Sequence, residues 1–139
     1  MSELAPVLEE FLDGHVVGVL ATEPPEGHPR QSVVYYLRDG DRLLVSSVAD
    51  RAKVRDVGTC EWASLCVMAP QHPFASATFS GRAQVLTEGI GPATAAIAQR
   101  FMQAPEPPEP LSDEALASVG RVIIAISIER VAAVSNLEA

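Results

Sequence analysis

The sequence predicts a mainly β protein with short helices, of the α+β class, in which an antiparallel sheet closes into a small barrel. Six or seven runs of apolar or alternating residues have the length and composition of strands. Most are joined by tight turns, which favour antiparallel over parallel pairing. The chain has 139 residues, 47% of them hydrophobic, which suits one domain (residues 1–139) with a sizeable core. A barrel also leaves no free sheet edge, so we expect this architecture.

The N-terminal segment predicts a helix followed by a strand. Residues 4–12 place apolar side chains at helical spacing, with Pro6 tolerable in the first turn and Gly14 as a stop. Residues 16–22 form a β-rich run, and residues 23–27 then carry turn-forming residue types. This run is the first expected strand.

The next segment alternates, as a strand with two different faces does. Within residues 29–38, one face carries Arg30, Ser32, Val34, Tyr36 and Arg38. The other face carries Gln31, Val33, Tyr35 and Leu37. The Asp39-Gly40 pair indicates a tight hairpin into a further strand at residues 42–48.

The middle of the chain predicts two more strands and a helix. Residues 63–68 and 75–87 are the strands. Gly81, inside the second, indicates either a bulge or the close approach of another backbone. Residues 92–103 are Ala-rich and have the spacing of an amphipathic helix.

The C-terminal segment begins with a proline-rich stretch. Residues 104–110 include four prolines, which exclude a helix or a central strand and predict a stiff, extended surface connection. Ser112 has the chemistry of an N-cap and opens a second short helix. Residues 121–128 and 131–134 are expected to close the chain as strands.

A basic cluster on an acidic chain is the clearest functional signal. The formal net charge is −8, yet three of the ten Lys+Arg residues, including the only lysine, Lys53, lie within residues 51–55. If Asp50 caps a short helix running to about Asp56, backbone N–H groups and cations would converge at its start. Such a helix start suits a phosphate group. The alternative is a solvated helix with scattered charge.

Composition excludes several other classes. A sequence pI near 4.7 argues against nucleic acid as a partner, and no apolar run reaches membrane-spanning length. The N-terminus lacks a signal peptide, and Cys60 and Cys66 form no metal or redox motif, so we expect a cytoplasmic protein. Ser32 has no nucleophile signature, and the three histidines (His15, His28 and His72) form no cluster, so hydrolase chemistry is not indicated.

Several stretches of the chain carry a family resemblance when taken in order. They are VGVLAT (17–22), GHP (27–29) with SVVYY (32–36), LLV (43–45) leading into RAKVR (51–55), and SGRAQV (80–85). RVII (121–124) and IERV (128–131) follow. Together they resemble the split-barrel flavin-binding family, which includes pyridoxamine phosphate oxidase-like proteins and oxidoreductases that use the deazaflavin coenzyme F-420. The likeness covers about residues 12–134.

The resemblance implies a phosphate site. Arg51 and Lys53 match the family's phosphate-binding positions. Ser47 matches a hydroxyl that helps there, although the loop length leaves Ser46 or Val48 open instead. The resemblance also implies a homodimer, with a cofactor in each of two grooves at the subunit interface.

The resemblance further implies which residues line the groove. Arg30 and Ser32 lie where the family lines it, and Tyr36 lies further along the same face. A strand tyrosine is also commonly a core or interface residue. Phe74 matches a position at which relatives place an aromatic residue near the cofactor ring.

The implied function is an oxidoreductase that moves a hydride to or from a small organic substrate. The motif order favours coenzyme F-420, with FMN as the alternative cofactor. The rival interpretations are a carrier of a flavin, deazaflavin or tetrapyrrole without turnover, and a decayed site. One departure bears on this choice: relatives usually continue Arg-Asn-Leu and further basic residues after the lysine, whereas this chain has Arg55-Asp56-Val57 and then Glu61. Acidic residues thus stand where a long anionic cofactor tail would be gripped.

Overall fold

The computed structural model describes residues 4–71 and 74–137. Its helices are α1 (Pro6–Asp13), α2 (Ala52–Cys60), α3 (Gly91–Met102) and α4 (Asp113–Ser118). Its strands are β1 (Val17–Thr22), β2 (Arg30–Asp39), β3 (Arg42–Val48), β4 (Trp62–Ala69), β5 (Ala75–Leu86), β6 (Arg121–Ser127) and β7 (Arg130–Ser135). His72, named above, lies outside the described residues. Within the described ranges, no helix combines the length and apolarity that crossing a bilayer requires.

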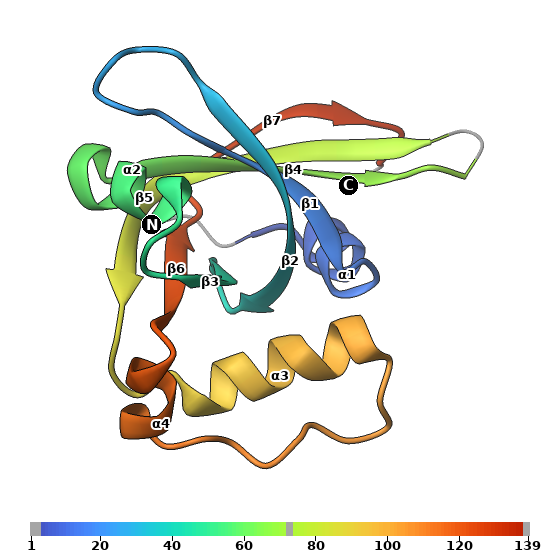
Figure 1. The fold of residues 1–139 in the computed structure, drawn as a ribbon. Helices are drawn as coiled ribbons and strands as arrows, with labels where there is room; N and C mark the ends of the chain where they lie inside the picture. The colour runs from blue at the N-terminus through green and yellow to red at the C-terminus, as the bar shows by residue number, and fades with distance from the viewer. Residues whose placement is uncertain (1–3, 72–73, 138–139) are drawn as a thin grey trace.

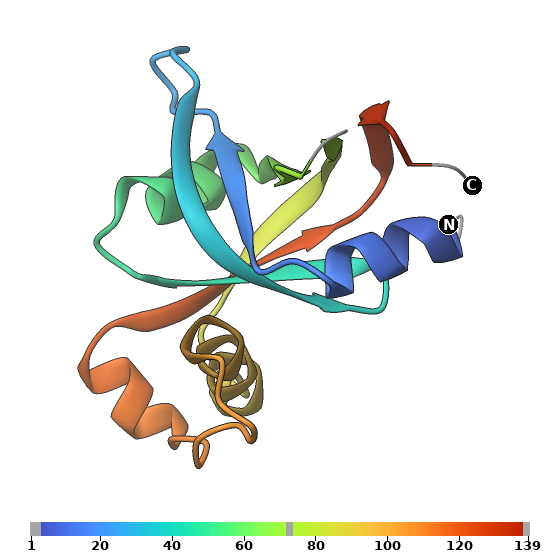
Figure 2. The same ribbon diagram turned by 90° about the vertical axis from the view of Figure 1, so that its right-hand side faces the viewer.

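The strands form a closed antiparallel barrel, as the sequence predicts. Their order is β4-β1-β2-β3-β6-β5-β7, and an additional β4–β5 pairing joins the two sides (Figure 1). The hairpin at Asp39 and Gly40 is also confirmed, since Asp39 pairs with Arg42. The helices surround the barrel. Helices α1 and α2 lie on opposite sides of it, and α3 and α4 lie together beneath β3 and β6 (Figures 1 and 2).

Gly81 marks the point along β5 at which the strand paired with it changes. On one edge, β5 pairs with β7 before Gly81 and with β6 after it. Between β6 and β7 the backbone crosses directly over Gly81, and the Glu129 N–H donates to the Ser80 carbonyl at 2.9 Å. A Cβ atom at Gly81 would lie 1.6 Å from the Ser127 carbonyl oxygen. Of the two alternatives that the sequence leaves open at Gly81, the close approach of another backbone is therefore the one observed.

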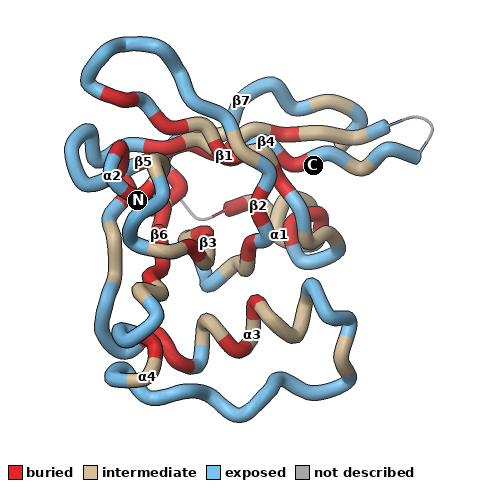
Figure 3. The backbone as a smooth tube through the Cα atoms, in the orientation of Figure 1, coloured by how far each residue is buried: buried red, intermediate tan, exposed pale blue. Residues whose placement is uncertain are grey.

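The core has two parts, one on each face of β3 and β6. The first fills the barrel and includes Leu20, Val45, Leu65, Phe79 and Ile124. The second lies between the barrel and helices α3 and α4, and consists of Leu44, Ile90, Ile97, Leu116, Ile123 and Ala125. The central part of β6 is consequently buried on both faces (Figure 3). This arrangement explains the continuous apolar run in that strand.

The start of α2 differs from the prediction. Arg51, and not Asp50, occupies the N-cap position, and no side chain caps the helix. The helix also runs beyond Asp56 to Cys60, and ends at Glu61 in the left-handed conformation (φ 60°). By contrast, the predicted cap at Ser112 is confirmed, because its Oγ accepts the Ala115 N–H at 3.1 Å.

Replacing Gly81 with alanine should destabilise the fold severely. The new methyl group meets backbone atoms, which cannot rotate away, so we expect a loss of at least about 3 kcal/mol in the free energy of unfolding. Urea denaturation followed by circular dichroism measures it. Gly58→Ala is the matched control: nothing lies within 4 Å of the new Cβ, and alanine in a helix should add up to about 1 kcal/mol. Equal effects of the two changes would contradict the crossing described above.

Candidate functional site

The cluster at the start of α2 holds two cations close together. Arg51 is exposed at the N-cap, and Lys53 is half-buried in the first turn. Burial, and then the neighbouring charge of Arg51, lower the pKa of Lys53 below its usual range. Over residues 4–71 and 74–137, neither cation lies within ion-pair distance of a carboxylate. Two like charges held without a counter-charge favour the binding of an anion.

The third cation of the cluster behaves differently. Arg55 Nη1 donates to the Asp50 carbonyl at 2.5 Å, on the loop that leads into α2. Its guanidinium therefore ties the helix to the preceding turn. Arg51 and Lys53, which the resemblance implies as phosphate ligands, therefore stay the candidate anion site, with Arg55 as a support.

A buried carboxylate seats α2 on the barrel. Asp56 is 4% exposed, and its Oδ2 accepts the Thr22 hydroxyl and Arg30 Nε, both at 2.8 Å. Burial alone would raise the pKa of Asp56, but these two hydrogen bonds hold it below its ordinary value. Val54 and Val57, on the same side of the helix, pack into the barrel core. The outward orientation of the cationic turn follows from these contacts.

Ser47, the residue predicted to assist the phosphate, lies on the inward face of β3. Ser47 is 5% exposed and shares the inward face of the strand with Val45. Ser46, which the sequence leaves open as the alternative, is on the outer face and accepts Arg121 Nη1 at 3.4 Å. Arg121 pairs across the sheet with Val48, three residues before Arg51. A serine of β3 and a further cation of β6 thus lie on the outer face of the sheet, near the turn that leads into α2.

The groove-lining prediction falls on the face of β2 that carries the buried Val34 and Tyr36. Tyr36 has no exposed surface, and its hydroxyl donates to the Leu12 carbonyl at 2.7 Å. Burial raises the pKa of Tyr36 far above its usual range. It is a core residue and cannot touch a ligand outside the barrel. Alternation identifies two faces of a strand but not which one points inward; here the exposed face carries Val33 and Tyr35.

The other predicted groove residues are dispersed. Arg30 is engaged by Asp56, and Ser32 is half-buried on the Tyr36 face of β2. Phe74 is 50% exposed at the start of β5. It belongs to the β4–β5 hairpin, which lies at the end of β4 opposite to α2 (Figure 1). One copy of the chain therefore does not bring Phe74 to the Arg51–Lys53 pair.

A cavity of about 220 Å³ lies between α3 and the outer face of the barrel. Its lining residues are Tyr35, Ser46, Thr94, Ile97, Ala98, Phe101 and Arg121. The rings of Tyr35 and Phe101 lie 5.0 Å apart. Thr94 belongs to no motif of the sequence, and Arg121, although it opens the RVII stretch (121–124), carries no site signal of its own. Only the fold brings these two residues to one place.

Arg100 fixes the helix that forms one wall of this cavity. Its Nη2 donates to the carbonyls of Leu12 and His15, at the corner between α1 and β1. Its guanidinium carbon also lies 5.4 Å from the centre of the Tyr36 ring. These contacts join α3 to the barrel, so the cavity wall is held by charge-assisted hydrogen bonds as well as by apolar packing.

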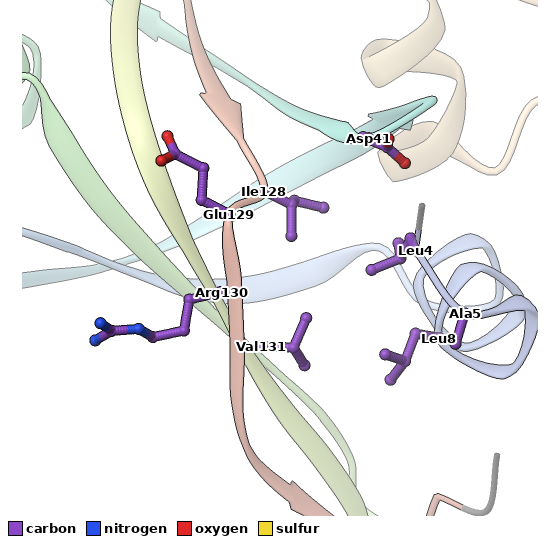
Figure 4. A pocket seen from close by; sticks show the side chains of 8 residues that line it. All are labelled: Leu4, Ala5, Leu8, Asp41, Ile128, Glu129, Arg130 and Val131. Carbon is purple, nitrogen blue, oxygen red and sulfur yellow. The ribbon is translucent and has the colours of Figure 1, made fainter. Parts of the chain in front are cut away.

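Two of the larger cavities lack the features of an anion site. The first, of about 250 Å³, lies between α1 and the β6–β7 junction. Leu4, Leu8 and Val131 line it, while the charged ends of Glu129 and Arg130 point away (Figure 4). The second, of about 380 Å³, includes Arg38 and Arg42. These two arginines already pair with Asp13 and Asp39. Across the part of the chain that the structure describes, no cluster of side chains suits a metal ion.

The outer face of β4, β1 and β2 is uncharged and open to solvent. Cross-strand register places Val33 beside Val19, and Val19 beside Cys66. The adjoining outward positions carry Tyr35, Val17 and Met68, which are 44%, 39% and 54% exposed, while Val33 is 72% exposed. We call these six residues the open sheet face. An apolar patch of this kind is uncommon on a monomeric protein surface.

Replacing Asp56 with asparagine should destabilise the protein at neutral pH by about 1–2 kcal/mol, because a charge-assisted contact at a buried site is lost. A carboxyl whose folded-state pKa is depressed stabilises the fold above its unfolded pKa, near 3.9, and loses that effect as pH falls through the folded-state value. The difference between variant and parent should therefore shrink below about pH 4.

Urea denaturation at pH 7, 4 and 3 checks this expectation. Asp39→Asn is the control, since the exposed Arg42–Asp39 pair should contribute less than about 1 kcal/mol. A difference between Asp56→Asn and the parent that stays constant down to pH 3 would show that charge at Asp56 is not what seats α2.

The comparisons with known proteins agree with this architecture. Residues 4–135 match the family described as pyridoxamine 5'-phosphate oxidase. Among solved structures, an F-420 reductase superposes with a TM-score of 0.72 at 23% identity, covering 89% of this chain and 94% of that one. A putative pyridoxamine 5'-phosphate oxidase from Listeria innocua gives 0.69 at 19% identity, covering 93% and 95%. HutZ, the heme storage protein from Vibrio cholerae, gives 0.66 at 14% identity, covering 96% of each chain.

No curated protein matches the sequence. The structural likenesses, at this level of identity, concern the fold. The family match spans nearly the whole chain and agrees with the closed antiparallel barrel. The resemblance predicted from the sequence is confirmed: this chain belongs to the pyridoxamine 5'-phosphate oxidase family.

Proposed function

We propose that this protein is an oxidoreductase that binds a phosphate-bearing deazaflavin, coenzyme F-420, with FMN as the alternative, and transfers a hydride to or from a small organic substrate. The observation that carries the proposal is the Arg51–Lys53 pair, two close cations without a carboxylate partner in the described chain. A phosphate there would relieve their mutual repulsion and form charge-assisted hydrogen bonds.

The chain's own residues have a restricted task in this proposal. A bound flavin or deazaflavin supplies the hydride chemistry itself. Arg51 and Lys53 hold the phosphate, with Ser46 and Arg121 beside them on the outer face of β3. The wall formed by α3 shields the adjoining cavity from water. No side chain needs to act as a nucleophile, which suits the lack of a catalytic motif.

The acidic departure after Arg55 weighs less against an anionic cofactor tail than the sequence suggests. Asp56 points into the barrel end, where Thr22 and Arg30 take up its carboxylate. Its charge is therefore compensated and does not face a ligand near Arg51. Glu61 lies beyond the C-terminal end of α2, away from the cationic first turn. This placement supports retaining coenzyme F-420 ahead of FMN.

We also propose that two copies associate through the open sheet face. Helix α3 meets this face at its Tyr35 margin, through Phe101, whereas α3 and α4 cover the outer face of β3 and β6. The residues of the open sheet face bear no charge, so bringing a second copy against them desolvates apolar surface and leaves no ion unpaired. A partner subunit could then supply its Phe74 to the groove that one copy leaves incomplete.

Replacing Lys53 with alanine should weaken cofactor binding roughly tenfold to a hundredfold, because one charge-assisted contact to phosphate is lost. Titration of each cofactor, followed by absorbance and fluorescence, gives the dissociation constants. Arg42→Ala is the matched control. Arg42 lies at the other end of β3 and pairs with Asp39, so its loss should leave affinity nearly unchanged. Equal losses of cofactor affinity in both variants would mean that Lys53 acts through long-range electrostatics and not as a phosphate ligand.

The single lysine also permits a direct measurement. Reductive methylation with ¹³C labels the Lys53 amine and the α-amine, and the two are separated by removing the first with Lys53→Ala. The pKa of Lys53 should lie below its usual range in the free protein and rise when the cofactor or inorganic phosphate binds. A pKa that does not change at saturation would place the phosphate elsewhere.

Turnover separates an enzyme from a carrier. The reduced cofactor, bound at saturation, should be oxidised by quinone, enone or nitroaromatic acceptors faster than in solution. Rates no faster than in solution for all three classes, with tight binding retained, would favour the carrier interpretation. Binding of a tetrapyrrole in preference to both flavins would do the same.

Replacing Val33 with aspartate should shift the protein towards a monomer, because a carboxylate at the centre of an apolar interface would be buried without a partner. Sedimentation at micromolar concentration should show a dimer for the parent and a monomer for Val33→Asp. Val119→Asp is the control, since Val119 is 63% exposed but lies between α4 and β6, outside the open sheet face of β1, β2 and β4. A parent that sediments as a monomer would remove the interface and the shared groove.

A further inference from the structure

The lining of the cavity beneath α3 includes hydrogen-bond donors from two elements, Thr94 of α3 and Arg121 of β6. Arg121 makes one long hydrogen bond, from Nη1 to Ser46 Oγ at 3.4 Å, and no ion pair with the described residues. The Thr94 hydroxyl, on the same lining, is shielded from solvent and has no partner in the described chain. No carboxylate lines the cavity. A shielded hydroxyl without a partner is costly, and rotation about the Thr94 χ1 bond would let it donate to the acceptor oxygens of a ligand in the cavity.

The rest of the lining is largely apolar and partly aromatic. Ile97 and Ala98 belong to α3, the helix that also carries Thr94, and the tilted rings of Tyr35 and Phe101 lie beside them. These two rings are 44% and 47% exposed, so they offer accessible flat surface to a ligand. A planar, conjugated ring suits such surfaces better than a flexible chain.

The size of the cavity limits the ligand. About 220 Å³ is smaller than the roughly 300–1,000 Å³ typical of sites for drug-sized molecules. The space suits one ring with one polar substituent. The single guanidinium makes an anionic substituent preferable to a neutral one, and the planar fork of arginine matches a carboxylate.

We propose that this cavity binds a small planar conjugated carboxylate, with its carboxylate on Arg121 and Thr94 and its ring against Tyr35 and Phe101. The inference rests on the proposed function only in treating this ligand as the substrate. Arg121 pairs with Val48, three residues before Arg51, so the cavity adjoins the cationic cluster along the outer face of β3. A ligand here lies beside a cofactor held at Arg51 and Lys53, and does not replace it.

Calorimetry on the full chain without cofactor tests the proposal, with trans-cinnamate and its neutral isostere cinnamamide as probes. We expect cinnamate to bind at least about tenfold more tightly, because only it presents a charge to Arg121. Arg121→Gln should remove the preference, and Arg121→Lys should keep part of it. Thr94→Val, which removes only the hydroxyl, should weaken cinnamate binding about threefold or more. Arg42→Gln, at a separate cavity, should change nothing.

Thermal unfolding of each variant shows that a loss of binding is not a loss of fold. Equal affinity for the two probes, or a preference that survives Arg121→Gln in the folded protein, would overturn the proposal. Saturating FMN or coenzyme F-420 should leave the affinity for cinnamate within about twofold. Competition between them would show that the cavity belongs to the cofactor, and would also overturn it. Cofactor binding without cinnamate binding removes this inference alone, whereas the reverse result removes the proposed cofactor and leaves this inference standing.

Discussion

The candidate site depends on one buried carboxylate. Asp56 joins α2 to β1 and β2 through Thr22 and Arg30, at 2.8 Å in each case. Burying an ionised carboxyl costs free energy unless hydrogen-bond partners replace its water. Few placements of α2 against the barrel give Asp56 such partners. Because Asp56, Val54 and Val57 face the barrel, the opposite side of α2 is free to carry cations. The same contact removes Arg30 from any ligand, which explains why the sequence pattern overestimated the number of positive groups at the site.

The elements were more predictable than their orientation. Strand positions, the hairpin at Gly40 and the close approach at Gly81 follow from local chemistry, which the sequence records directly. Local chemistry does not determine which face of β2 points inward, because alternation is the same for both faces. Tyr36 and Ser47 were therefore assigned to the groove although both point into the barrel. Knowing that α1 covers the barrel beside Tyr36 would have settled the choice, but that is a long-range contact.

Although the protein is acidic overall, the pairing of its charges leaves a group of cations without carboxylate partners beside the outer face of β3. Carboxylates pair with Arg30, Arg38 and Arg42, and backbone carbonyls engage Arg55 and Arg100. The cations beside the outer face of β3, which are Arg51, Lys53 and Arg121, have no such carboxylate among the described residues. Net charge describes the far field, whereas affinity for an anion depends on the charges within about 10 Å, the distance over which salt screens. A net charge of −8 is thus compatible with phosphate recognition.

The two halves of the barrel wall differ in how their outer faces are covered, and this difference connects assembly with function. On β3 and β6, helices α3 and α4 bury Leu44 and Ile123, and Arg100 pins α3 in place, so this half is complete within one chain. On β1, β2 and β4 the outer face remains apolar and open. Tyr35 stands at the boundary, with its ring against Phe101 of α3 and its neighbour Val33 in the open sheet face. A second copy docking on that face would come up to the rim of the cavity beneath α3. The proposed substrate and cofactor would then lie where one chain's covered half meets the surface of its partner, and association would close the site to water.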